Sequence, residues 1–348
     1  MRKLMILLLS VIIFAGCKDP GGSSGGTKTA TENSGFGSAT NPGDTGVLTV
    51  GSETLNMQYA QDQANVTFPT ETDDSSTQTL TTKFFISETE VTNAVVAEVY
   101  QWACDNNRFN TTNSGAHNYL STTTVKHGGQ ELLDLDDGSN YCKINYDGNG
   151  HFTVDNGYDD HPVVNISWYG AIMFCNWLTE MRDGNTDNLV YGGIDTSWDH
   201  TETTEDISKN GYRLPGSYEW EYAARYRSDS TNAALPGTYS NPWYTKGNSA
   251  SDATADYNNS TATGEVAWYS TNSGNLLHAV KEKRVNDLGL FDMSGNVLEW
   301  CFTQDTPDRV ARGGSWDDAA DTLRVGNVNG DSPDSEGRHI GFRLCRTR

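Results

Sequence analysis

The chain has 348 residues and a formal net charge of −22, because 46 aspartates and glutamates face only 24 lysines and arginines. This charge repels phosphate backbones and no basic cluster offsets it, so we expect no nucleic-acid partner. The nine tryptophans and sixteen tyrosines place the apolar content in large rings, which argues against a disordered chain and favours a loop-rich globular fold.

The N-terminus has the pattern of an export signal. A basic start is followed by the apolar run 4–14 and then by Ala15, Gly16 and Cys17. The run is too short to span a bilayer, which requires about 20 residues, so residues 1–16 are predicted to be a signal peptide. Small residues before a cysteine resemble the lipobox of bacterial lipoproteins, which implies that Cys17 is lipidated. We therefore expect an exported, lipid-anchored protein displayed at the outer membrane, with an ordinary signal peptide as the alternative.

Residues 17–45 are rich in Gly, Ser, Thr and Asn and contain almost no large apolar side chain. Such a composition is typical of a flexible tether. From residue 46 onward, short apolar segments alternate with turn residues, so residues 46–348 are predicted to form the folded domain.

Local periodicity predicts a strand and a helix near the start of this domain. Residues 79–86 alternate polar and apolar side chains as a strand does. Residues 93–104 have the apolar spacing of a helix, and Thr92 is a suitable residue to precede it.

Two further helices are predicted in the middle of the chain. One covers residues 168–182, where apolar residues form a broad face and Gly184 follows the end. A shorter one covers residues 216–227. The polar stretches 105–160 and 228–263 are predicted to be mainly loops.

Five cysteines remain if Cys17 carries lipid, and none of them forms a CxxC pair. An exported chain permits disulfides, but an odd number leaves at least one thiol outside an intrachain pair. The five are Cys104, Cys142, Cys175, Cys301 and Cys345.

Four motifs occur in a distinctive order along the domain. They are HPVVNISW at 161–168, YRLP at 212–215 with EWEYA at 219–223, NDLGLFDMSGNVLEW at 286–300, and RGGSW at 312–316 with IGFR at 340–343. Together they closely resemble the formylglycine-generating enzyme family. The resemblance implies an α+β, loop-rich domain with the C-type lectin fold of the formylglycine-generating enzyme, or sulfatase-modifying factor, type.

The third motif contains a candidate metal site. Gly289 and Gly295 permit tight turns, and Asp292, Asn296 and Glu299 supply oxygen atoms around them. Such oxygens suit a hard cation, and many members of the family bind structural calcium. The alternative is that these groups cap loop backbone. We expect no required cofactor, with calcium as the metal hypothesis.

The catalytic residues of the family are missing. Its oxidase holds copper with a cysteine pair shortly after the Arg-Gly-Gly-Ser motif. Here residues 302–344 contain no cysteine, and the seven histidines include no H-x3-H pair. We therefore expect no enzyme activity. A family disulfide between Cys175 and the C-terminus is also in doubt, because Cys345 lies one residue later than in the family pattern.

Residues 317–339 consist mainly of Asp, Asn, Ser, Gly, Ala and Thr. Their framework, RGGSW…LR…N…PD…IGFR, resembles the variable proteins of diversity-generating retroelements. The resemblance implies a surface whose residues are exchanged to bind a protein or glycan on another cell or host. The candidate ligand-facing residues are Asp317, Asp318, Ala319, Asp321, Thr322, Gly326, Asn327, Asn329, Gly330, Asp331, Ser332, Ser335, Gly337, Arg338 and His339.

Framework residues are expected to hold this segment from below. Apolar anchors are Trp316, Leu323, Ile340 and Phe342, and two arginines, Arg312 and Arg343, are expected to pair with carboxylates. Two other functions remain open: a catalytic member of the superfamily with an unrecognised site, and an invariant structural lipoprotein.

Overall fold

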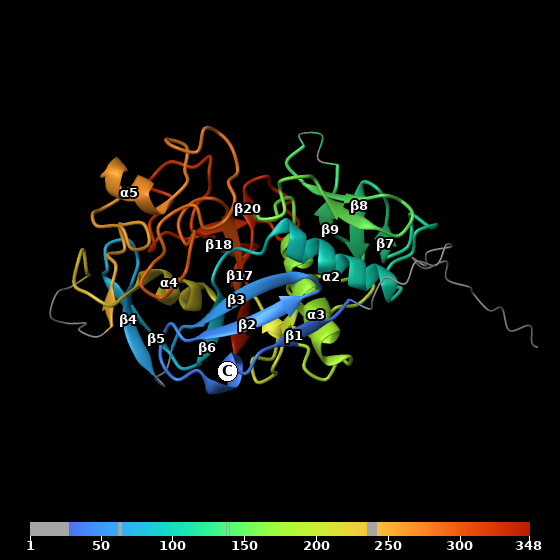
Figure 1. Cartoon of the computed structure of the whole chain (residues 1–348), viewed down its shortest axis with the longest axis horizontal. Helices are drawn as coiled ribbons and strands as arrows, with labels where there is room; N and C mark the ends of the chain where they lie inside the picture. Colours follow the sequence, from blue (N-terminus) through green and yellow to red (C-terminus); the bar gives the residue numbers. More distant parts are fainter. Residues whose placement is uncertain (1–27, 62–64, 137, 139, 235–241) are drawn as a thin grey trace, which may run out of the picture.

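The computed structural model describes residues 28–61, 65–136, 138, 140–234 and 242–348. The predicted signal peptide, Cys17 and the first part of the tether lie outside the described residues. Within the described ranges, no helix is long and apolar enough to cross a bilayer. Short strands, a few helices and much irregular chain make an α+β domain, as the sequence predicts (Figure 1).

The largest sheet joins the two ends of the domain. Its order is β1 (Ala30–Glu32), β2 (Thr45–Val50), β3 (Glu53–Tyr59), β6 (Phe84–Ser87), β21 (Cys345–Thr347) and β14 (Tyr212–Arg213). Neighbouring strands are antiparallel throughout. The C-terminal strand therefore lies inside the sheet, between strands from the beginning and the middle of the chain.

This sheet corrects the predicted tether boundary. Ala30 pairs with Val50 in β2, so residues from 28 onward belong to the domain. Phe36, in the short helix α1 (Gly35–Ser38), is buried with its ring centroid 4.9 Å from that of Phe85. Burial of the Phe36 ring and the backbone hydrogen bonds between β1 and β2 order this segment despite its polar composition.

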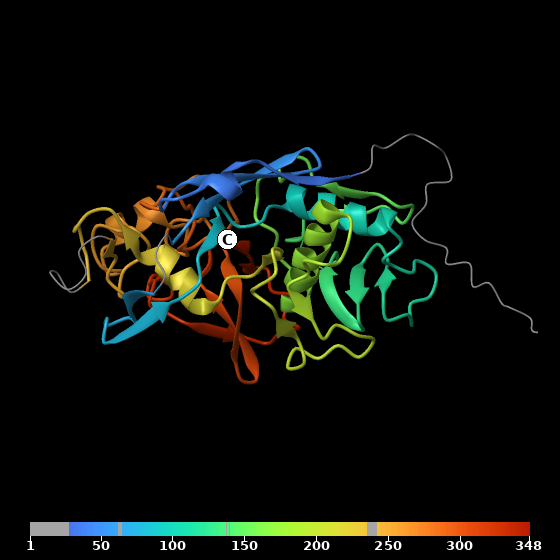
Figure 2. The same ribbon diagram turned by 90° about the horizontal axis from the view of Figure 1, so that it is seen from below.

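A second sheet carries the C-terminal motifs. Its order is β19 (Asn329–Asp331), β18 (Asp308–Arg312), β17 (Leu298–Asp305) and β20 (Ile340–Gly341). β17 and β18 form a hairpin that projects from the molecule in Figure 2, and β20 runs parallel to β17. This sheet therefore holds both ends of the segment 317–339, and β19 lies at its edge.

Three of the helices lie at the predicted positions, whereas the helix at residues 260–266 was not predicted and begins in a stretch expected to be mainly loop. These helices are α2 (Asn93–Asp105), α3 (Trp168–Asp183), α4 (Ser217–Arg225) and α5 (Ser260–Val266). Ser167 caps α3, since its Oγ accepts a hydrogen bond from the Gly170 amide at 3.1 Å. Gly184 ends α3 with a φ of 69°, a left-handed conformation that suits glycine. α2 and α3 pack against each other on one side of the molecule (Figure 1).

The remaining strands form small antiparallel units. They are β4 (Val66–Thr70) with β5 (Ser76–Leu80), β7 (Tyr119–Leu120) with β8 (Thr124–His127) and β9 (Gln130–Asp134), β10 (Ile144–Tyr146) with β11 (Phe152–Val154), β12 (Tyr191–Gly192) with β13 (Thr204–Glu205), and β15 (Tyr226–Arg227) with β16 (Trp243–Tyr244). Two predictions are corrected. The single strand at 79–86 is the end of β5 and the start of β6, and the stretch 105–160 contains five strands.

Candidate ligand-binding face

Arg312 holds the start of the C-terminal segment through buried polar contacts. Its Nη2 lies 2.8 Å from Glu221 Oε2 in α4, and both side chains are 1% exposed. Its Nη1 donates to the Asn327 carbonyl at 2.7 Å, so this arginine reaches across the loop that it precedes. The prediction that Arg312 is a structural partner of a carboxylate is confirmed.

Arg343 holds the other end in the same way. Its Nε and Nη2 each lie 2.6 Å from one oxygen of Glu299, a bidentate pair that is buried. Trp220 Nε1 also donates to Glu299 Oε2 at 2.6 Å. The second, third and fourth sequence motifs therefore meet at one carboxylate, so each of the three contributes to the same buried contact.

The predicted apolar anchors are all buried. Trp316 is 2% exposed, and Leu323, Ile340 and Phe342 are fully buried. Trp316 also donates its backbone amide to Asn296 O at 2.8 Å. These contacts fix the ends and the middle of the segment while the residues between them reach the surface.

Most of the fifteen candidate residues have solvent access. Five are exposed: Ala319, Asp321, Gly330, Ser332 and Arg338. Nine are half-buried: Asp317, Asp318, Thr322, Asn327, Asn329, Asp331, Ser335, Gly337 and His339. The segment is drawn in red around β18 and β20 in Figure 1.

Gly326 is a correction to the candidate set. It is buried, and a Cβ at this position would lie 2.4 Å from the backbone C and O of Glu71. Because no side chain fits there, Gly326 belongs to the framework and cannot face a ligand.

Contacts among the candidates form small local groups. Arg338 Nη2 lies 3.4 Å from Asp317 Oδ2, which joins the two ends of the segment. Ser335 Oγ donates to Asp331 Oδ2 at 3.2 Å. Within the described residues, no hydrogen bond or ion pair joins these two groups, so the first surrounds Trp316 and the second lies next to β19.

Two of the aspartates also stabilise the turn that presents them. Ser315 is buried, and its Oγ lies 2.8 Å from Asp317 Oδ1 and 2.7 Å from Asp318 Oδ2, so the two carboxylates share its one hydroxyl hydrogen. The Ser315 amide donates to the same Asp318 oxygen at 2.9 Å. Asp318 is therefore mainly a turn-forming residue, whereas Asp317 also reaches Arg338.

A tyrosine far away in the chain completes the group around Trp316. The Tyr141 ring stacks on Trp316 with 5.6 Å between centroids and 19° between planes. The Arg338 guanidinium lies over both rings, 5.2 Å from the Tyr141 centroid and 5.4 Å from that of Trp316. Sequence reasoning missed Tyr141, because it sits in the stretch predicted to be loop and carries no local signal.

Two residues inside the segment differ from the rest in environment. Val328 is 46% exposed, an apolar side chain that the candidate set leaves out. Glu336 is half-buried, and burial together with the nearby Glu131 and Asp134 carboxylates raises the pKa of Glu336 to about 8. Val328 could have been found from its apolar character in a polar run, but the setting of Glu336 depends on tertiary packing.

The residues of the calcium hypothesis do not fit a cation in this structure. Both oxygens of Glu299 bind Arg343, and Asn296 Oδ1 accepts the His278 amide at 3.2 Å. Among the side-chain oxygens of these three residues, only Asp292 Oδ1 is buried without a hydrogen-bond partner. Burial raises the pKa of Asp292 to about 6. In the described ranges, no group of three or more His, Cys, Asp or Glu side chains could hold a metal ion. The alternative, loop and framework stabilisation, describes Glu299 and Asn296 better.

The thiols are not placed for catalysis. Cys175, Cys301 and Cys345 are free and fully buried. Burial raises the pKa of each thiol, which disfavours the thiolate that copper binding or nucleophilic attack requires. Cys175 and Cys345 are not joined, in agreement with the doubt over that disulfide.

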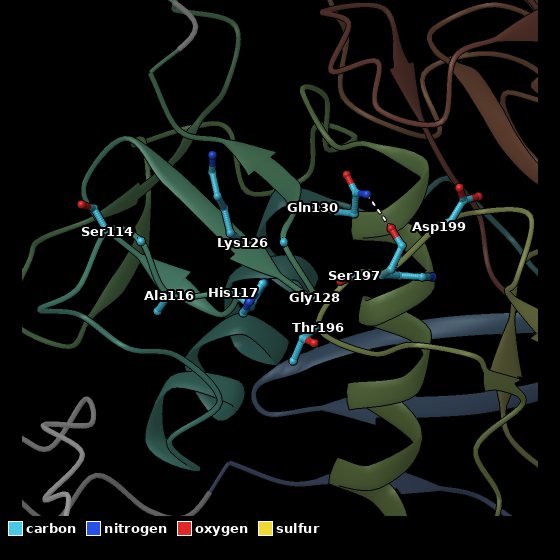
Figure 3. Close-up of a pocket in the computed structure, with 12 residues that line it drawn as sticks. Ser114, Ala116, His117, Lys126, Gly128, Gln130, Thr196, Ser197 and Asp199 are labelled. Atoms are coloured by element: carbon cyan, nitrogen blue, oxygen red, sulfur yellow. Dashed lines mark hydrogen bonds between the residues drawn. The ribbon is translucent and has the colours of Figure 1, made fainter.

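A hollow of about 570 Å³ lies beside β8 and β9, and none of its lining residues belongs to the segment 317–339 (Figure 3). His117 and Lys126 line it, but Figure 3 shows the lysine pointing away from the histidine. Gln130 and Trp198 also line it, and Gln130 Nε2 donates to the Trp198 carbonyl at 2.5 Å. The arrangement offers no nucleophile with an adjacent base.

Comparison with known proteins places the chain in a family. A model described as the sulfatase-modifying factor enzyme 1-like domain matches residues 38–348. The chain belongs to this family. Chaperone protein LppX of Paenibacillus barcinonensis is 31% identical over 218 residues, which cover 55% of this chain and 71% of that protein.

Two other similarities bear on function. Inactive C-alpha-formylglycine-generating enzyme 2 of Bos taurus is 30% identical over 195 residues, which cover 53% of this chain and 50% of that protein. The structure of Treponema denticola variable protein 1 superposes with a TM-score of 0.54 at 26% identity, covering 87% of this chain and 98% of that one. These similarities confirm the C-type lectin fold of the formylglycine-generating enzyme type. They fit a non-enzymatic variable protein within the sulfatase-modifying factor family.

Proposed function

We propose that this family member is a surface-displayed lipoprotein that binds a protein or glycan through residues 317–339, which a retroelement diversifies. One observation carries the proposal: mostly small side chains that are at least partly accessible lie between buried anchors. Arg312, Trp316, Leu323 and Ile340 form those anchors. The likeness to Treponema denticola variable protein 1 supports it.

The energetics favour exchange at these positions. Small polar residues lose little rotamer entropy, and replacing an exposed side chain leaves the packed anchors untouched. The Tyr141–Trp316–Arg338 stack would supply a rigid aromatic element beside the variable residues. Aromatic and arginine side chains are enriched where binding energy concentrates.

The genomic surroundings provide the first test. We expect a second copy of codons 317–339 near the gene, differing at adenines, together with a reverse-transcriptase gene. Codons 286–300, which encode the buried framework, serve as the control and should have no such copy. Absence of both the repeat and the reverse transcriptase contradicts diversification.

Display at the cell surface is tested separately. In cells fed a labelled fatty acid, the wild-type chain should incorporate label and the Cys17→Ser variant should not. Protease added to intact cells should digest the wild-type domain. Label on the variant, or complete protection from protease, contradicts a surface lipoprotein.

The proposed function predicts no oxidase activity, whereas the enzymatic alternative predicts turnover. Purified protein incubated with copper or iron and a sulfatase-type cysteine peptide should produce no aldehyde, measured by mass spectrometry beside an active formylglycine-generating enzyme. Turnover would establish the alternative. An invariant structural lipoprotein, the remaining alternative, predicts a constant 317–339 segment among isolates.

A further inference from the structure

We propose that a cavity between β3 and the start of α2 is a binding site for a short aliphatic polyamine. The cavity has a volume of about 370 Å³, and residues 279–282 also line it. None of the lining residues belongs to the segment 317–339. The site is therefore separate from the candidate face and does not depend on the function proposed for it.

The charged residues that line the cavity favour a positively charged ligand. Four carboxylates line the cavity, those of Glu53, Glu88, Asp160 and Glu282, against the single cation Lys281. Lys281 Nζ lies 2.6 Å from Glu88 Oε2 and neutralises that group. The other three carboxylates have no lysine or arginine partner among the described residues, so a cation gains most from entering.

Two of these three carboxylates have weak polar neighbours. Ser52 Oγ donates to Glu53 Oε1 at 3.1 Å, and His278 Nδ1 lies 3.3 Å from Glu282 Oε2. A neutral hydroxyl and a histidine that is charged only when protonated compensate little of their charge. An ammonium group would make stronger, charge-assisted hydrogen bonds to both.

Two threonines in the wall of the cavity offer hydroxyl groups that no other group in the described residues binds. Thr89 is 2% exposed and Thr92 is 8% exposed, and both line the cavity. Thr92 occupies the N-cap position of α2, but its side chain makes no capping hydrogen bond. Within the part of the chain that the structure describes, neither hydroxyl is hydrogen-bonded. Each hydroxyl oxygen can therefore accept a hydrogen bond from an ammonium N–H in the cavity.

The nearby helix N-terminus does not make this an anion site. The amides of Asn93 and Ala94 already donate to the carbonyls of His161 and Asp159. Two of the amides that could hold an anion are therefore occupied, and three uncompensated carboxylates would repel it.

Apolar lining residues favour a ligand that also has an aliphatic part. Leu55 and Val95 line it and are 4% and 3% exposed. A methylene chain can lie on these side chains while its amino groups reach the carboxylates at the rim. A polyamine combines both features in one molecule.

Calorimetric titration of the purified full chain with spermidine at about 0.15 M salt tests the proposal, since this ionic strength screens interactions between distant exposed charges. We expect saturable binding with one molecule per chain. In the double variant Glu53→Gln/Glu282→Gln, the affinity should fall at least about tenfold, because charge-assisted hydrogen bonds are lost. Thr89→Val, which keeps the shape and removes one hydroxyl, should also weaken binding.

The control is the double variant Asp187→Asn/Glu202→Gln, which removes two exposed carboxylates outside the cavity. It changes the net charge equally and should bind as the wild type does. Absence of saturable binding overturns the proposal. Equal weakening in both double variants also overturns it, because the attraction would then be a general effect of the acidic surface.

Discussion

The ring of Tyr141 stacks on the ring of Trp316, with centroids 5.6 Å apart and planes inclined by 19°. This contact joins the middle of the chain to the start of the C-terminal segment and covers one of its anchors. Arg338, from the end of that segment, lies over both rings. Three distant parts of the chain thus form one element of the candidate face.

Replacing Tyr141 by alanine should reduce stability modestly. Loss of the stacked pair is expected to cost about 1 kcal/mol of unfolding free energy, measured by urea denaturation. Tyr218, which is 39% exposed, provides the control, and Tyr218→Ala should change stability by less than about 0.5 kcal/mol. Equal effects at the two positions would show that the stack contributes nothing.

The buried ion pair of Arg312 and Glu221 should contribute more to the free energy of unfolding than the Tyr141–Trp316 stack does. Arg312→Met leaves Glu221 Oε2 without its partner while Arg225 still binds Oε1, so we expect a loss of roughly 1–3 kcal/mol in the same denaturation experiment. The matched control is Arg338→Met. Its partner Asp317 is 3.4 Å away and its own side chain is 50% exposed, so the loss should be about 1 kcal/mol or less. A small effect at Arg312 would contradict its anchoring role.

Substitutions should be tolerated at the exposed positions of the segment 317–339 and not at its buried positions. Ala319→Tyr and Ser332→Tyr, both at exposed positions, should change the unfolding free energy by less than about 0.5 kcal/mol. Gly326→Ala should cost at least about 1–3 kcal/mol, because its Cβ would overlap the Glu71 backbone. If thermal melts show the reverse order, the division into framework and exchangeable residues is wrong.

Several elements could be predicted from sequence because their signals are local. Periodicity and Gly184 predict α3 to within one residue of its observed end, Asp183. The pairing of Arg312 with a carboxylate follows from its motif. The strand β1 could not be predicted, since its stability comes from pairing with β2 rather than from its own polar residues.

The candidate face shows the same division. Composition and the framework motifs mark the stretch that we propose to be variable, and fourteen of the fifteen candidates are at least partly accessible, with Gly326 the exception. Gly326 resembles its neighbours in composition but packs against Glu71, which is distant in sequence. Tyr141 was missed for the related reason that only the fold brings it to Trp316.

Glu336 predicts how stability depends on pH. Burial and the Glu131 and Asp134 carboxylates raise the pKa of Glu336 from 4.5 to about 8, so the folded state holds the proton more tightly than the unfolded state. Stability from this group is complete below pH 4.5 and is lost as the pH rises to 8.

Replacing Glu336 by glutamine should remove this dependence. After allowance for partial exposure, we expect the variant to be about 2 kcal/mol more stable than the wild type at pH 9 and nearly equal at pH 5. Glu202→Gln, at an exposed position, is the control and should behave as the wild type at both values. A Glu336→Gln variant that is less stable at pH 9 would contradict the assignment.

Deep sequencing of codons 312–342 from a clonal population tests the central claim most directly. Substitutions are predicted to gather at the accessible positions of 317–339, while Trp316, Leu323, Gly326 and Ile340 stay constant. A segment that is constant in every copy, or one whose changes fall equally on these four buried residues, would contradict an exchangeable face held by a fixed framework.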